Sequence, residues 1–125
     1  MYELYLVISY SEFKLTHNGM HFRYNIGLLK HQEGDLKSAI GMYRKAIAID
    51  DDRADVHNNL GVALKNQGDL VGAEAAYRKV MAMQPTHANC HINLANILGK
   101  EGRTDEARAL YQKGKALANA RKEKL

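Results

Sequence analysis

ADVHNNLGVALKNQGDLVGAEAAYRKVMAMQPTH, residues 54–87, is the stretch that the rest of this chain repeats. Within it Leu60, Gly61, Gly68, Ala73 and Tyr77 stand at offsets that recur 34 residues earlier and 34 residues later. The earlier copies are Ile26, Gly27, Gly34, Ala39 and Tyr43, and the later copies are Leu94, Ala95, Gly102, Ala107 and Tyr111. The chain is therefore an array of three consecutive units.

The units recur every 34 residues. Each has a small residue after an aliphatic one, a glycine seven residues later, and then an alanine and an aromatic residue four apart. This pattern resembles the tetratricopeptide repeat (TPR). The resemblance covers about residues 20–119, because the copies agree in phase throughout that range. It departs from the family at His57 and His91, where Trp or Tyr is frequent, and a closing proline is present only at Pro85.

The resemblance implies an all-α fold, a right-handed superhelical solenoid of antiparallel helix pairs built from three TPR units. The expected units are residues 20–53, 54–87 and 88–125, and the third ends in an extended basic C-terminal helix. Residues 1–19 match the repeat poorly and are expected to form a degenerate N-terminal segment or capping helix. The run Leu4–Tyr10 is also rich in strand-favouring residues, and periodicity alone does not settle so short a run.

Local signals place the helices of each unit. The first helix of the first unit carries Phe22 and Leu29 on an apolar stripe that we expect to pack inward, and it ends at Gly34, since glycine adopts a left-handed conformation at low cost. Asp35 stands where its carboxylate can cap the second helix. Tyr43 is expected to fill the space between helix pairs.

Composition allows one domain and excludes several classes. Hydrophobic residues make up 46% of 125 residues, and no apolar run approaches the roughly 20 residues that span a bilayer. Glu3 makes the start acidic, unlike a secretory signal. We therefore expect no membrane span and a cytoplasmic location. The single cysteine, Cys90, shares its offset with Val56 and is expected to be a packing residue.

The net charge of +4 lies entirely in the tail. Lys, Arg, Asp and Glu balance from Met1 to Gln112, whereas five basic residues from Lys113 onward face only Glu123. Such a run can contact nucleic acid, anionic lipid or an acidic partner. We favour a solvated helix end, because cations near a helix C-terminus interact favourably with the helix dipole. No aromatic residue interleaves them for base stacking, so we expect no nucleic acid partner.

The histidines are weak candidates for a metal site. His17 and His21 are four residues apart, and His87, Cys90 and His91 fall within five residues, but neither group has the further ligands of a zinc site. The glycines are isolated helix stops and form no phosphate loop. No nucleophile motif is present. We predict no metal, no cofactor and no catalytic residues, so the protein is expected not to be an enzyme.

Packing leaves one pattern unexplained, a row of asparagines that recurs once in each unit. Asn25, Asn59 and Asn93 share one offset, directly before the core Ile or Leu of each first helix, and the resemblance places this offset on the concave surface. A side-chain amide offers a donor and an acceptor, as a peptide backbone requires. The row is similar to the asparagine ladder in the repeat arm of O-linked N-acetylglucosamine transferase. The alternative is that these amides serve the fold.

The resemblance carries further groove positions over by offset. They are Asn58, Asn89, Asn96, Asp55 and Lys65. Members that bind chaperone tails grip a terminal carboxylate with Lys and Arg at such positions, whereas this chain is rich in amides there, which disfavours that clamp.

Taken together, the patterns predict a non-catalytic protein-protein interaction scaffold that binds an extended peptide segment in its concave groove through the asparagine ladder. The alternative is a structural module that associates end to end with another copy, or a fragment of a longer TPR protein such as the accessory arm of a glycosyltransferase.

Overall fold

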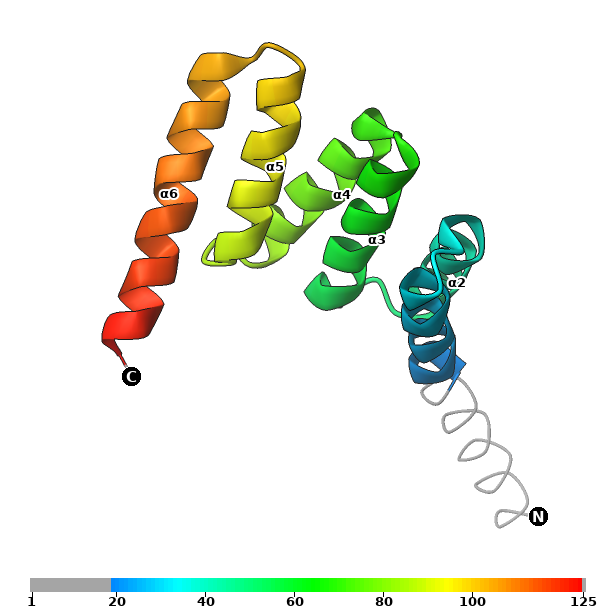
Figure 1. Ribbon diagram of the computed structural model, residues 1–125. Coiled ribbons are helices and arrows are strands. Elements are labelled where there is room, and N and C mark those ends of the chain that lie inside the picture. The colour runs from blue at the N-terminus through cyan, green and yellow to red at the C-terminus, as the bar shows by residue number, and fades with distance from the viewer. Residues whose placement is uncertain (1–18, 125) are drawn as a thin grey trace, which may run out of the picture.

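A computed structural model describes residues 19–124, and every regular element in that range is an α-helix (Figure 1). Residues 19–32 form the first helix. The helices that follow are α2 Leu36–Ile49, α3 Ala54–Gln67, α4 Leu70–Met83, α5 Ala88–Lys100 and α6 Thr104–Glu123. The capping segment expected at residues 1–19 lies outside the described residues, apart from Gly19.

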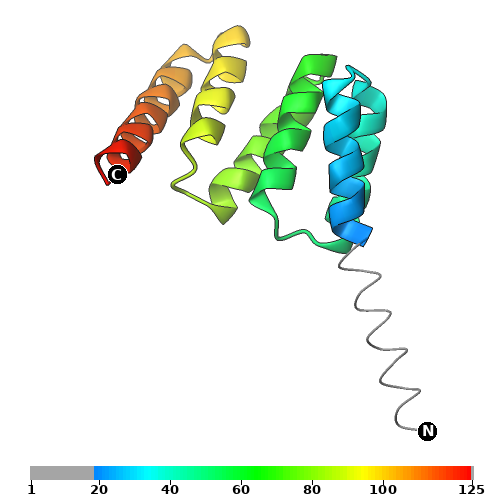
Figure 2. The ribbon, with the colours of Figure 1, turned by 60° about the horizontal axis from the view of Figure 1, so that its bottom comes forward.

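The helices stack in chain order as antiparallel pairs. α2 contacts α3, α3 contacts α4, α4 contacts α5 and α5 contacts α6, so each helix packs on its sequence neighbours. α3 also contacts α5, which brings successive first helices together. Figure 2 shows the pairs side by side, with helix 19–32 at one end and α6 at the other. The architecture is the right-handed all-α solenoid that the repeat predicted.

Each unit breaks into two helices at a glycine. Gly68 has φ 94°, a left-handed conformation that favours glycine, and its N–H donates to the carbonyl oxygens of Leu64 and Lys65. Gly34 and Gly102 adopt the same conformation. The residue after the first of these turns is the predicted cap, since Asp35 Oδ1 accepts from the N–H of Ser38 at 3.2 Å. α2 begins directly after this cap, as predicted.

The two helices of a unit interlock through a glycine and a tyrosine. A Cβ built on Gly27 would lie 2.6 Å from Tyr43 Cε1, and one on Gly61 would lie 2.7 Å from Tyr77 Cε1. Both rings are fully buried. The ring of each second helix therefore lies directly on the backbone of its first helix, and only glycine leaves room for it.

The ends of the stack depart from the sequence expectation. Phe22 and Leu29 were predicted to pack inward, but their side chains are 65% and 58% exposed, whereas Val56 at the offset of Phe22 is fully buried. Tyr111 is 44% exposed, although its counterparts Tyr43 and Tyr77 are buried. Val56 is buried because α3 packs against the preceding unit. Among the described residues, no complete helix pair precedes helix 19–32 and none follows α6.

A charged network joins the second helices α4 and α6. Arg78 Nη2 donates to Glu106 Oε1 at 2.8 Å, and Arg103 Nη1 donates to Glu74 Oε1 at 3.1 Å. Arg103 Nη2 also donates to Glu106 Oε2 at 2.8 Å, and Arg78 Nε donates to Glu74 Oε1 at 3.0 Å. Each carboxylate thus bonds both guanidinium groups, and the network ties the second repeat to the third.

The glycine contact can be tested by adding one carbon. Gly61→Ala places a methyl group 2.7 Å from a buried ring, so we expect it to lower the free energy of unfolding by about 1–3 kcal/mol. Urea unfolding followed by far-UV circular dichroism measures the change. Gly41→Ala is the matched control, because nothing lies within 4 Å of its Cβ. It should raise stability by up to about 1 kcal/mol through helix propensity. Equal effects at the two sites would contradict the interlock.

Removing each of the two buried tyrosine hydroxyls should change the free energy of unfolding in opposite directions. Tyr43 Oη lies 3.2 Å from His31 Nδ1, whereas the buried Tyr77 Oη has no hydrogen-bond partner among the described residues. Tyr77→Phe should raise the free energy of unfolding by about 1 kcal/mol, because it removes an unsatisfied polar group. Tyr43→Phe should lower it by about 0.5–1.5 kcal/mol. Parallel urea titrations of both variants give the comparison, and equal shifts would refute it.

Candidate peptide-binding surface

The three asparagines at one offset lie on the three first helices. Asn25 is on helix 19–32 and exposed, while Asn59 on α3 and Asn93 on α5 are half-buried. Their backbone positions are equivalent because the helices repeat, but their surroundings differ. Asn25 and Asn93 make no hydrogen bond to another described side chain, so both amides are free to bind a ligand.

Asn59 is engaged with the preceding repeat. Its Nδ2 donates to Tyr24 Oη on helix 19–32 at 2.7 Å, although the two residues are 35 positions apart in sequence. The bond shows that the face of α3 that carries Asn59 contacts helix 19–32. It also means that Asn59 contributes to the joint between the first two repeats, in line with the alternative that this amide serves the fold.

Arg53 and Asp55 extend this joint. Arg53 Nη2 donates to Asp55 Oδ2 at 2.7 Å and its Nε donates to Oδ1 at 3.0 Å, while its guanidinium carbon lies 6.0 Å from the centre of the Tyr24 ring. Burial acts to raise the pKa of Asp55, but the hydrogen bonds and charge of Arg53 outweigh it and lower that pKa. Burial, followed by the charge of Asp55, raises the pKa of Tyr24. Asp55 is thus an ionised, already paired carboxylate.

The equivalent joint between the second and third repeats is incomplete. Asn58 occupies the offset of Tyr24, and its buried Oδ1 has no hydrogen-bond partner between residues 19 and 124. Asn is too short to reach the next helix as Tyr24 does, and Asn93 makes no bond corresponding to that of Asn59. The amide of Asn93 therefore remains free where the amide of Asn59 is used.

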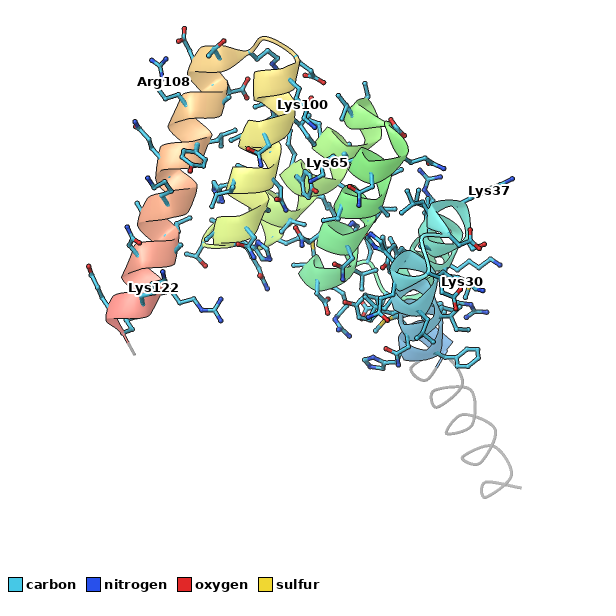
Figure 3. All side chains as sticks on the ribbon, in the orientation of Figure 1. Lys30, Lys37, Lys65, Lys100, Arg108 and Lys122 are labelled. Atoms are coloured by element: carbon cyan, nitrogen blue, oxygen red, sulfur yellow. The ribbon has the colours of Figure 1, made fainter. Side chains whose placement is uncertain are left out.

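The other predicted groove residues are accessible to different degrees. Asn89 and Asn96 on α5 are exposed, and Lys65 near the end of α3 is half-buried (Figure 3). None of these three side chains pairs with another described residue. Sequence reasoning missed Arg53, although its position two residues before Asp55 at the start of a helix was a signal for the ion pair.

The histidine and cysteine cluster serves packing. His57 Nε2 lies 2.9 Å from Asp51 Oδ1, and His91 Nδ1 lies 2.8 Å from the His87 carbonyl oxygen. Cys90 is fully buried, and its Sγ donates to the same carbonyl oxygen at 3.1 Å. Burial raises the pKa of the Cys90 thiol to about 11. A thiol of this kind is a poor nucleophile even though His91 Nδ1 is only 3.7 Å away.

Two further features of the described range bear on function. Between residues 19 and 124, no three His, Cys, Asp or Glu side chains come together as a metal would need. His17, one member of the first histidine pair, lies outside that range. No helix between residues 19 and 124 combines the length and the hydropathy needed to cross a bilayer.

Family comparison agrees with the geometry. A profile described as tetratricopeptide repeat matches residues 52–120, more than half of the chain, and a second described as TPR repeat matches residues 27–68. The chain is a tetratricopeptide repeat protein. No curated protein sequence matches it.

Solved structures share the fold of this TPR protein at low sequence identity. MamA superposes with a TM-score of 0.80 at 21% identity over 83% of this chain and 61% of MamA, so the TPR chain spans about three fifths of that neighbour. PcrH in complex with the chaperone binding region of PopD gives 0.79 at 20% identity, covering 83% and 78% of the two chains. The first TPR of Spaghetti (RPAP3), bound to an HSP90 peptide, gives 0.75 at 16% identity, with 78% of each chain covered.

The inert character of Cys90 can be measured directly. Raising the pKa from 9.0 to about 11 reduces the thiolate fraction at pH 8 about a hundredfold, and burial restricts access further. Alkylation by iodoacetamide, followed by mass spectrometry, should be at least about a hundredfold slower in the native TPR protein than in urea. Equal rates in the two states would show that Cys90 is accessible and would reopen thiol chemistry at this position.

Proposed function

We propose that this TPR protein is a non-catalytic scaffold that holds an extended segment of a partner protein along its first helices. The observation that carries the proposal is the row of amides on successive first helices, of which Asn25 and Asn93 have no side-chain partner. Each can donate to a backbone carbonyl and accept from a backbone N–H. Asn89, Asn96 and Lys65 add further free polar groups, while Asn58 and Asp55 border the row.

The dimensions of the stack suit such a ligand. Helices pack about 10 Å apart, so three helix pairs extend over about 30 Å, the length of about nine extended residues. PcrH and the first TPR of Spaghetti (RPAP3), which share this fold, were solved with a protein segment or peptide bound. Their low identity limits the likeness to the fold, so the residues of this chain carry the argument. A cytoplasmic location remains the prediction made from the sequence.

Asn59 has a double role in this proposal. Its Nδ2 is held by Tyr24 Oη, and its Oδ1 remains available to accept a hydrogen bond from a ligand. Asp55 is held by Arg53 and therefore contributes shape and charge rather than a free acceptor. The ladder is consequently uneven, with free amides at Asn25 and Asn93 and a positioned amide between them.

The exposed ends of the stack favour a second candidate, end-to-end self-association. Phe22 and Leu29 at one end and Tyr111 at the other are exposed apolar side chains at offsets that are buried inside the array. Burying one end against the other would be a heterologous contact and would form open chains. Sedimentation velocity over a range of concentrations tests this. A single monomer peak at all concentrations, unchanged by Tyr111→Lys, would eliminate the self-associating candidate.

Substitution of the free amides tests the scaffold. A peptide of about nine residues, selected from a random display library on this protein, serves as the probe. The double variant Asn25→Ala and Asn93→Ala should weaken its binding by about 0.5–1.5 kcal/mol per amide, the net value of one hydrogen bond, without changing the melting temperature. Fluorescence anisotropy gives the affinity and circular dichroism the melting temperature.

Two controls separate binding from folding. Asn66→Ala and Asn119→Ala remove exposed amides outside the row and should leave affinity unchanged. Asn59→Ala and Tyr24→Phe both remove the inter-repeat hydrogen bond, so each should lower stability, but only the loss of Asn59 removes the amide oxygen. The scaffold proposal fails if the double variant binds the selected peptide as well as the unaltered protein does.

A further inference from the structure

A hollow lies beside the last helix. It has a volume of about 660 Å³ and is formed between the loop that leads into α5 and the last two turns of α6. Asn89, one of the predicted groove residues, lines it together with Gln84. The hollow therefore adjoins the proposed peptide-binding surface at its C-terminal end.

Two cations line this hollow without a counter-charge. Arg121 and Lys122 are exposed, and neither forms an ion pair with a described residue. No carboxylate is among the described residues that line the hollow. Three other arginines are paired, Arg78 and Arg103 in the network between the second and third repeats and Arg53 with Asp55. Arg121 and Lys122 thus place two unpaired positive charges at a concave site.

The rest of the lining indicates which anion fits. Gln84 and Asn89 supply amide donors, and Leu117 and Ala118 supply a small half-buried apolar surface. Amides and cations together bind carboxylates well. His87 is the one aromatic ring among the described lining residues, and its Nδ1 accepts from the N–H of Cys90, so the hollow lacks the larger aromatic rings on which bases usually stack. This apolar surface is too small to anchor the protein in a lipid bilayer.

We propose that this basic hollow binds an acidic stretch of the partner segment and so selects partners that carry Asp or Glu where they leave the row of amides. The inference rests on the proposed function, because it assigns a charge preference to one end of the same ligand. It also assigns a task to the tail cations, which the sequence alone could treat as a solvated helix end. Arg121 and Lys122 would favour one direction of the bound chain, because both lie at one end of the surface.

Two matched peptides test the inference. Both have about nine residues, one with Glu at three consecutive C-terminal positions and the other with Gln there. The acidic peptide should bind more tightly at about 20 mM salt, and the difference should shrink at about 300 mM, where screening is strong. In the double variant Arg121→Gln and Lys122→Gln, affinity for the acidic peptide should fall about two- to thirtyfold, the range for two exposed ion pairs. Affinity for the Gln peptide should not change.

The chain offers a matched control for charge. Lys100 and Arg108 are exposed and unpaired in the same helix pair, but they lie at the opposite end of α5 and α6 from Lys122 (Figure 3). The double variant Lys100→Gln and Arg108→Gln removes the same two charges and should retain the preference for the acidic peptide. If both double variants lose the preference equally, the effect is one of net charge and the inference is overturned. Melting temperatures identify any variant that fails to fold.

The same measurements distinguish this inference from the proposed function. If the variant lacking Asn25 and Asn93 weakens both peptides while that lacking Arg121 and Lys122 changes neither, the hollow has no role and the scaffold stands. If only the loss of Arg121 and Lys122 matters, the amide row fails and the basic site stands. A single-stranded RNA of matched charge provides the last comparison. Tighter binding of that RNA than of the acidic peptide, lost in the same variant, would overturn the choice of an acidic protein segment.

Discussion

The contact between a first-helix glycine and a second-helix tyrosine determines the spacing of this molecule. Gly27 and Gly61 each lie against a fully buried ring, and a Cβ at either position would come within 2.7 Å of it. Close packing of this kind leaves no freedom in the distance between the helices. Because the contact recurs in the first two units, both hold their two helices at the same close distance.

The third unit shows what happens when this constraint is relaxed. Ala95 replaces the glycine, and Tyr111, the ring that would lie on it, is 44% exposed. Close approach is instead taken over by Gly114, where a Cβ would lie 2.7 Å from the side chain of Ile92. α5 and α6 are therefore held by a different glycine from the other pairs. α6 also continues to Glu123, which creates the hollow beside the start of α5.

Charge is divided between two tasks. On α4 and α6, arginines and glutamates bond one another and join neighbouring repeats, so they offer little to a partner. At the end of α6, Arg121 and Lys122 form no ion pair with a described residue. Exposed ion pairs contribute little to stability individually, whereas unpaired cations around a concave surface raise the local concentration of anions. The first arrangement suits a scaffold, and the second suits recognition.

The sequence by itself determined the helix pairs, the glycine turns and the cap at Asp35, because these depend on local periodicity and on residues within one turn of each other. It also identified Asn25, Asn59 and Asn93 as equivalent, since equivalence follows from spacing. Only the tertiary structure decided that they are not alike. Asn59 bonds Tyr24 from 35 positions away, whereas Asn58 is too short to offer Asn93 the same partner. The exposure of Phe22 and Tyr111 was likewise decided by which helices have a neighbour, a property of the whole stack rather than of any one repeat.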